Sequence, residues 1–267
     1  MLRRARQSGF TLVELIVVIV VLGAISAGTA LYVVRSMEAY SDTVRRDQLT
    51  SGARVAVERL TRELRNALPN SVRVDNDSGT THCIEFFPVE SGSSYDSVPR
   101  TAANISFAAI AYAPPQTPAH VAVFPHATQP LYTHNNPGPL ADYDPANSEP
   151  ANGVVYLDND HRFTHDSPRK RFFLTGEPVS YCVDPDGDLK RYRGYGIDST
   201  QSVPPTGVTG ALLAENLQLS DGGNAVTPFA YTAGSLQRSA VVTLDLRFME
   251  EGEWVRLLHE VQIRNVP

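Results

Sequence analysis

The chain lacks the short motifs that mark most catalytic sites. Its 267 residues contain no nucleophile elbow, no His-Glu-x-x-His sequence, no phosphate-binding glycine loop and no tightly spaced cysteine and histidine pattern. An excess of positive charge is also missing, because 23 Lys and Arg face 29 Asp and Glu, giving a net charge of −6. We therefore expect no enzymatic activity, no cofactor and no nucleic-acid partner.

One long apolar run is present. Between Phe10 and Val34 the only ionisable side chain is Glu14. A helix over this segment rises about 37 Å, enough to cross a hydrocarbon core about 30 Å thick with some tilt. Residues 1–9 carry three arginines, and a basic flank of this kind stays in the cytoplasm. The sequence predicts a single-pass membrane protein whose remaining chain is exported.

The start of this run has a specific pattern. A short basic leader (residues 1–9) ends in Gly9, and Phe10 opens the sequence Phe-Thr-Leu-Val-Glu-Leu. This pattern resembles the class III signal and first helix of type IV pilins and type II secretion pseudopilins. In that family a membrane aspartyl prepilin peptidase cuts after the glycine and methylates the new terminal phenylalanine. The resemblance implies cleavage between Gly9 and Phe10, N-methylation of Phe10, and a bacterial inner-membrane anchor with a periplasmic head.

Glu14 becomes the fifth residue of the mature chain under this resemblance. The freed Phe10 amine would lie at the positive end of a helix dipole, in or beside lipid, which is unfavourable. Glu14 of an adjacent subunit could neutralise this amine and so favour docking of a new subunit. The resemblance therefore implies that Glu14 is an assembly residue. It also implies partnership with other pilin or pseudopilin subunits, the inner-membrane assembly platform and membrane lipid.

Two other interpretations of the segment remain open. Small residues at positions 24–28 could admit an ordinary signal peptidase. The run could also be a plain single-span anchor with an incidental Glu14, although an isolated acid is disfavoured at membrane depth. Sequencing the mature N-terminus distinguishes the three.

The helical pattern continues beyond the apolar run as an amphipathic stripe. Apolar residues recur at spacings of three and four, with charged residues on the other faces. The members of the stripe are Ala53, Val57, Leu60, Leu64 and Ala67. Pro69 stops the pattern. We expect a transmembrane helix over 10–34, an amphipathic helix over 35–68 and an exported head over 69–267.

Strand patterns dominate the head. The clearest is a hairpin in which residues 242–248 alternate apolar and polar, residues 250–253 turn the chain, and the alternation resumes from Val255. A helix followed by an antiparallel sheet is the α+β, pilin-like arrangement. The C-terminal run 257–267 also resembles minor pilins of the mannose-sensitive haemagglutinin system.

Cysteine is scarce, with only Cys83 and Cys182. An even count in an exported chain permits a disulfide, here closing a very long loop. Two buried free thiols are the alternative, because both residues stand in apolar, strand-like runs.

The head contains a segment rich in turn-forming residues. Residues 88–170 are enriched in Pro, Asn, Gly, Ser and His, so we expect a loop-rich insertion. Loops often carry binding residues, and Tyr132 and Tyr143 could offer exposed stacking surfaces for a glycan. His161 and His165 could hold a transition metal. A solvent-exposed connection with no partner is the alternative.

One acidic cluster has calcium-like spacing. Asp184, Asp186 and Asp188 alternate, but Gly187 precedes the third acid and Tyr195 stands where an EF-hand needs a bidentate glutamate. A Pro-Asp-Gly turn explains the same residues. Calcium binding is retained as the alternative.

These observations favour a structural subunit. We expect a minor pilin or pseudopilin that initiates or caps a filament, belonging to either a type IV pilus or a type II secretion system. The alternative is a filament-displayed adhesin or ligand-binding subunit that uses the insertion.

Overall fold

The computed structural model describes residues 10–76, 80–114, 118–234 and 238–263. The chain divides into two compact units, residues 1–48 and 49–267. The long helix α1 (Leu12–Arg65) belongs to the first unit as far as Gln48 and to the second unit from Leu49 onward. Each unit is described by itself.

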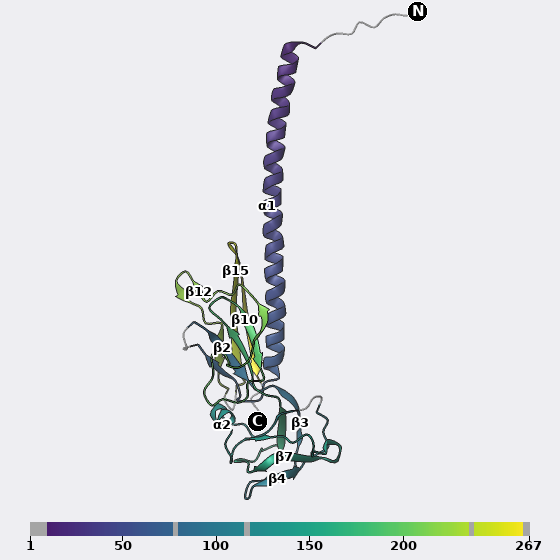
Figure 1. Cartoon of the computed structure of the whole chain (residues 1–267), viewed down its shortest axis with the longest axis vertical. Coiled ribbons are helices and arrows are strands. Elements are labelled where there is room, and N and C mark those ends of the chain that lie inside the picture. Colours follow the sequence, from purple (N-terminus) through teal and green to yellow (C-terminus); the bar gives the residue numbers. More distant parts are fainter. Residues whose placement is uncertain (1–9, 77–79, 115–117, 235–237, 264–267) are drawn as a thin grey trace, which may run out of the picture. The chain divides into compact units, whose positions relative to one another are not determined.

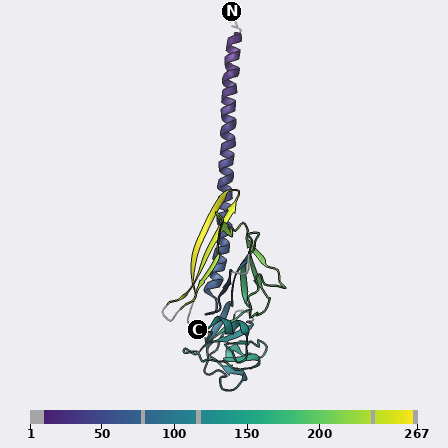
Figure 2. The ribbon, with the colours of Figure 1, turned by 90° about the vertical axis from the view of Figure 1, so that its left-hand side faces the viewer.

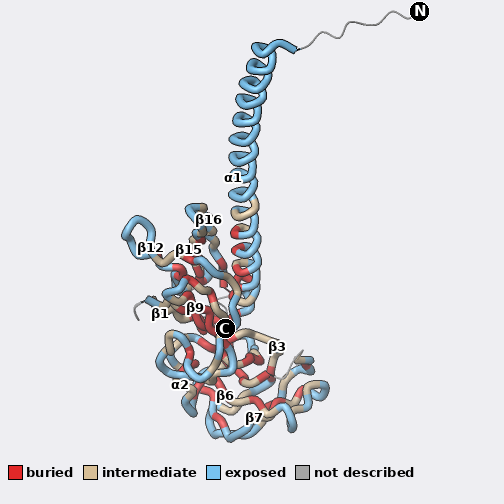
Figure 3. Tube along the Cα trace, turned by 45° about the horizontal axis from the view of Figure 1, so that its top comes forward, coloured by how far each residue is buried: buried red, intermediate tan, exposed pale blue. Residues whose placement is uncertain are grey.

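The first unit contains the apolar part of α1 and a polar stretch that continues to Gln48. Every residue from Phe10 to Thr43 is exposed, as the pale blue of this segment in Figure 3 shows. Its hydropathy and length make it a candidate membrane span. An apolar helix with no buried face needs lipid or other protein around it.

In the second unit, α1 buries one face. The buried residues are Leu49, Ala53, Ala56, Leu60, Thr61 and Leu64. The predicted stripe is thus largely confirmed, with Val57 only partly buried. The helix ends at Arg65, before the expected residue 68, because the backbone N–H of Leu68 donates to the Phe87 carbonyl at 2.8 Å.

Two antiparallel sheets pack against this face. The first has the order β1-β2-β9-β10-β11, and the second has the order β14-β15-β16. Their strands are β1 (Arg73–Asp75), β2 (His82–Phe86), β9 (Val179–Val183), β10 (Leu189–Arg193), β11 (Ala211–Ala214), β14 (Phe229–Thr232), β15 (Ala240–Glu250) and β16 (Glu253–Ile263). Residues of both sheets and of α1 form one apolar core, which we call the main core. The α+β, pilin-like fold is therefore confirmed.

The C-terminal hairpin forms at the predicted place in the chain. Glu250 pairs with Glu253, and the pairing continues to Ala240 and Ile263. Glu251 and Gly252 both have positive φ, which is typical of the two-residue hairpin turn that matches strand twist. Figure 2 shows this hairpin, in yellow, beside the C-terminal part of α1. A small ribbon, β12 (Ser220–Asp221) with β13 (Asn224–Ala225), precedes it.

The insertion is more ordered than expected. It forms a lobe, which we call the inserted lobe (residues 89–175), labelled in Figure 1 by α2, β3, β4 and β7. Its elements are β3 (Val89–Ser94), β4 (Asn104–Ala108), β5 (His120–Val123), α2 (Thr128–Thr133), β6 (Leu140–Asp142), the 3₁₀ turn η1 (Pro150–Asn152), β7 (Val154–His161) and β8 (Arg171–Thr175). One sheet has the order β3-β8-β5-β6, and β4 pairs with β7. Twelve buried residues, mostly aromatic and branched, give the lobe a core of its own.

The two ends of the inserted lobe meet. The backbone N–H of Gly176 donates to the Pro88 carbonyl at 3.1 Å, and that of Val89 donates to the Asn66 carbonyl at 2.8 Å. The chain therefore leaves the sheet β1-β2-β9-β10-β11, which we call the main sheet, after β2 and returns to it at β9 through adjacent points. A third apolar cluster, which includes Leu68, Phe87 and Tyr132, lies at this junction.

Candidate functional site

The N-terminus of α1 carries the residues on which assembly is expected to depend. The Thr11 hydroxyl accepts a hydrogen bond from the backbone N–H of Glu14 at 3.3 Å, so Thr11 acts as the helix cap. Glu14 lies in the first helical turn, where the helix dipole favours a negative charge. This cap is a feature that the sequence reasoning missed, although Thr-x-x-Glu before an apolar run is its usual signature.

Glu14 is the one carboxylate in an exposed, apolar helical surface. Leu12, Val13, Leu15 and Ile16 beside it are all more than half exposed. Gly9 lies outside the described residues, so cleavage between Gly9 and Phe10 stays a prediction. The role of Glu14 in assembly also stays a prediction. Glu14 thus places a single negative charge in the first turn of α1. The apolar side chains around it are exposed and can contact lipid or another helix.

In the head, the predicted disulfide is confirmed. Cys83 on β2 and Cys182 on β9 are bonded, and they face each other directly in the strand register. Both are fully buried, in a small cluster with Tyr192. The bridge therefore joins the strand that precedes the inserted lobe to the strand that follows it.

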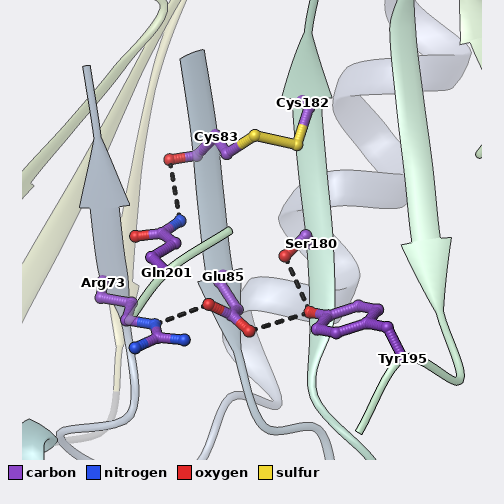
Figure 4. The surroundings of a disulfide bond; sticks show 7 residues. All are labelled: Arg73, Cys83, Glu85, Ser180, Cys182, Tyr195 and Gln201. Atoms are coloured by element: carbon purple, nitrogen blue, oxygen red, sulfur yellow. Dashed lines mark hydrogen bonds and ion pairs between the residues drawn. A yellow bond between two sulfur atoms is a disulfide. The ribbon is translucent and has the colours of Figure 1, made fainter. Parts of the chain in front are cut away.

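A buried ion pair lies next to this disulfide (Figure 4). The Arg73 Nε donates to Glu85 Oε2 at 2.6 Å, and the Tyr195 hydroxyl donates to Glu85 Oε1 at 3.0 Å. Burial raises the pKa of the Glu85 carboxyl, while Arg73 and Tyr195 act to lower it. The Arg73 guanidinium also lies 3.5 Å from the centre of the Tyr132 ring, so this cluster holds the inserted lobe against the main sheet.

The Asp184 cluster forms the predicted turn. The Asp184 Oδ1 accepts the backbone N–H groups of Asp186 and Asp188, and Gly187 has a φ of +84°. The Lys190 ammonium lies 2.7 Å from Asp184 and 3.0 Å from Asp188. Burial acts to raise the pKa of Asp184, but the contacts with Lys190 and the backbone prevail and lower it. A lysine thus already neutralises two of the three candidate calcium ligands; calcium binding itself stays a prediction.

The structure gives His161 and His165 separate surroundings. The His161 Nε2 lies 3.1 Å from the Gly138 carbonyl oxygen, and burial lowers the pKa of this ring. The His165 ring instead packs against His126, with ring centres 4.4 Å apart.

A different group was missed by the sequence reasoning. His120, His134 and Asp142 bring one ligand atom each within 4.8 Å of the others, which no other such group of His, Cys, Asp and Glu does in the described part of the chain. Hydrogen bonding to Asp142 raises the pKa of His134, and the two histidines, His120 foremost, lower that of Asp142. These residues come from β5, the end of α2 and β6, so no local spacing in the sequence reveals them.

The predictions that Tyr132 and Tyr143 offer exposed stacking surfaces are wrong. Tyr132 is buried in the junction cluster and donates its hydroxyl to the Ser71 carbonyl at 2.9 Å. Tyr143 is buried in the lobe core, and its hydroxyl lies 3.2 Å from that of Tyr112. Both rings are buried, one at the junction and one in the lobe core, so neither offers a stacking surface.

Comparison with known families finds one match. Residues 4–30 match the prokaryotic N-terminal methylation motif. Comparisons with curated proteins and with solved structures found no match. The matched residues include positions 4–9 of the basic leader, Phe10, Glu14 and the first part of α1, which is followed by antiparallel sheets. The motif, together with this order of elements, indicates a type IV pilin-like or pseudopilin-like protein, of the kind that prepilin peptidase processes.

Proposed function

We propose that the chain is a minor pilin or pseudopilin, a structural subunit that helps to initiate or cap a filament. It is anchored in the bacterial inner membrane by α1, with the N-terminus cytoplasmic and the head periplasmic, until the assembly platform moves it into the filament. It catalyses no reaction of its own.

The observation that carries this proposal is the lone charge of Glu14 in an exposed apolar helix. Removal of the leader creates a positive amine at Phe10, four residues away. Burying either charge alone among apolar side chains is costly, whereas a pair between neighbouring subunits compensates both. The arrangement therefore favours side-by-side packing of helices with one subunit's Glu14 at the next subunit's N-terminus.

The inserted lobe supports a minor position rather than a repeated one. It adds a second core to the head, and a bulky head is easier to accommodate at a tip or sparsely along a fibre than in every layer.

The second candidate function is a filament-displayed binding subunit. The observation that favours it is that the inserted lobe has its own core and joins the main sheet through adjacent points. Such a module can be displayed without disturbing the sheet that packs on α1. Removing the lobe while keeping α1 separates the two functions, because assembly is then tested without display.

The test of the main proposal is Glu14→Gln in the full chain, which removes the charge and keeps the size of the side chain. We expect normal removal of the leader, and at least a tenfold decrease of the subunit in sheared filaments, because the amine of Phe10 loses its counter-ion. Glu38→Gln is the matched control. It removes an exposed carboxylate from α1 outside the apolar run, and we expect wild-type incorporation.

Gly9→Ser supplies the unprocessed reference. We expect this variant to remain in the inner membrane with the mass of the full precursor, because the peptidase prefers glycine at that position. Intact-mass measurement then shows whether Glu14→Gln is processed. Wild-type incorporation of Glu14→Gln would refute the assembly role.

A further inference from the structure

We propose that His120, His134 and Asp142 form a binding site for a divalent transition-metal ion of the zinc type, located in the inserted lobe. The proposal is independent of filament assembly. It rests on the placement of three ligand atoms and on the surroundings of the His120 ring.

The three side chains converge on one point. Asp142 Oδ1 lies 2.9 Å from His120 Nδ1 and 3.3 Å from His134 Nε2. All three ligand atoms lie within 4.8 Å of one another. Ligand atoms around a tetrahedral zinc with bonds of about 2.0–2.1 Å are separated by about 3.3–3.4 Å. Two of the three separations are therefore close to what such an ion requires, and the third is no more than 4.8 Å.

The other nitrogen of His120 is the second observation. His120 Nε2 is buried without a hydrogen-bond partner, on a side chain that is only 7% exposed. The nearest carboxylate oxygen, Glu177 Oε1, lies 3.8 Å away. Glu177 Oε2 is also buried without a partner. His120 Nε2 and the Glu177 carboxylate thus lie near each other, at a distance just beyond that of a hydrogen bond.

Metal binding at Nδ1 would complete this contact. An ionised Asp142 can only accept a hydrogen bond, so this contact requires the proton of a neutral His120 to be on Nδ1. A metal takes the Nδ1 lone pair, so the proton moves to Nε2 and faces the Glu177 carboxylate. Metal-bound histidines usually donate their second N–H to a carboxylate in this way. Glu177 is then a positioning residue for His120, outside the set of ligands.

The fold holds the ligands in place before any ion arrives. His120 on β5 and Asp142 on β6 are direct partners in the strand register. The Phe87 ring packs edge-on against the His120 ring, with centres 6.1 Å apart. His134 ends α2 in the left-handed conformation, with a φ of 47°. The ion would therefore tie together β5, β6 and the end of α2.

The ligand types indicate which ion fits. Two imidazoles and one carboxylate suit zinc and similar transition metals, whereas calcium and magnesium prefer oxygen ligands only. Three protein ligands leave one position of a tetrahedral ion open to water or to an outside ligand.

The test uses the full chain in detergent micelles, without a histidine tag, stripped by a chelator and titrated with Zn²⁺ by calorimetry. We expect one Zn²⁺ per chain and no comparable binding of Ca²⁺. His134→Asn, which suits the left-handed conformation, and Asp142→Asn should each weaken binding by more than about 100-fold. Glu177→Gln should weaken binding by about 10- to 100-fold, as is typical for groups that position a ligand.

His126→Gln is the control, because His126 and His165 form the other close histidine pair. We expect it to bind as wild type does. Co²⁺ added to the wild type should give the visible absorption of a tetrahedral site, which needs no variant to fold. The proposal is overturned if the wild type binds no stoichiometric Zn²⁺, if Asp142→Asn binds as well as wild type, or if His126→Gln alone abolishes binding.

Discussion

Arg73 and Glu85 form a buried pair whose members depend on each other. The side chains are 14% and 2% exposed, so neither charge is well hydrated. Removing one partner of a buried pair is strongly destabilising because the other charge is left without compensation. The Arg73 side chain also donates to the carbonyls of Asp198 and Ser199 and covers the Tyr132 ring.

We predict that Arg73→Met lowers the free energy of unfolding by about 3–5 kcal/mol. Thermal unfolding of the full chain in detergent, followed by near-ultraviolet circular dichroism, measures this change. The double variant with Glu85→Gln should recover part of the loss, since the uncompensated charge is gone. A loss unchanged in the double variant would show that the stacking on Tyr132, and not the charge, is what matters.

The same pair predicts a pH dependence. The pKa of Glu85 is raised in the folded state, so its contribution to stability is present below its unfolded pKa and is lost as the pH rises through the folded pKa. Arg73→Met removes a group that lowers this pKa. The folded pKa of Glu85 then rises further above its unfolded pKa, and the pH range between the two becomes wider. The variant should regain more stability than wild type does when the pH falls from 7 to 5.

At this scale the sequence predicts features that a residue count or a local pattern reveals. The disulfide joins positions 99 residues apart, and it followed from an even cysteine count in an exported chain. Glu85 was not predicted to be buried, because its partners Arg73 and Tyr195 lie 12 and 110 positions away. His120, His134 and Asp142 were missed for the same reason, whereas His161 and His165 drew attention only because acids flank them in the sequence.

Among the elements, α1 in the second unit depends on its apolar stripe. Leu60 and Leu64 are fully buried in the main core. On the opposite side, Arg62 and Glu58 form an ion pair at 2.8 Å with both side chains 73% exposed. Exposed pairs of this kind contribute little to stability.

We predict that Leu60→Ala destabilises the head by about 2–5 kcal/mol, through lost burial and the cavity that remains. Arg62→Ala on the same helix should change stability by no more than about 0.5 kcal/mol. Thermal unfolding of the two variants makes the comparison. Equal effects would mean that α1 is not held by its stripe.

The elements that the sequence predicts correctly are those with a regular spacing of apolar residues. The stripe on α1 and the hairpin β15–β16 have strict periods over many residues, and both are confirmed. Residues 88–170 break such periods with Pro and Gly, which suggested loops. Most of their strands are short, and several pair across long separations, as β3 and β5 do with β8. The lobe core therefore arises from contacts that no local pattern shows.

At the scale of the whole molecule, the inserted lobe is a removable part of the head. Its ends meet at Pro88 and Gly176, and neither the main core nor the disulfide contains a lobe residue. The junction is the exception, because Leu68 and Phe87 are covered by lobe residues such as Leu131. A chain without the lobe exposes these two side chains.

We predict that replacing residues 89–175 by a short glycine linker, together with Phe87→Ser, leaves a chain that still forms the Cys83–Cys182 bond. Thiol titration under denaturing conditions measures this bond. Such a chain should enter filaments if the subunit is structural, while any adhesion that depends on the lobe is lost. Free thiols in the purified chain would show that the main sheet needs the lobe in order to fold.

The bond between Cys83 and Cys182 also determines which part of the chain bears a pulling force applied at the two termini. The two cysteines are separated by 99 positions, and the whole inserted lobe lies within the ring that they close. A pull that enters at one terminus and leaves at the other passes across the sulfur bridge and bypasses the ring. About 330 Å of extended chain is therefore not released when the two termini are pulled apart. The lobe remains folded under a force that unfolds the sheets around it.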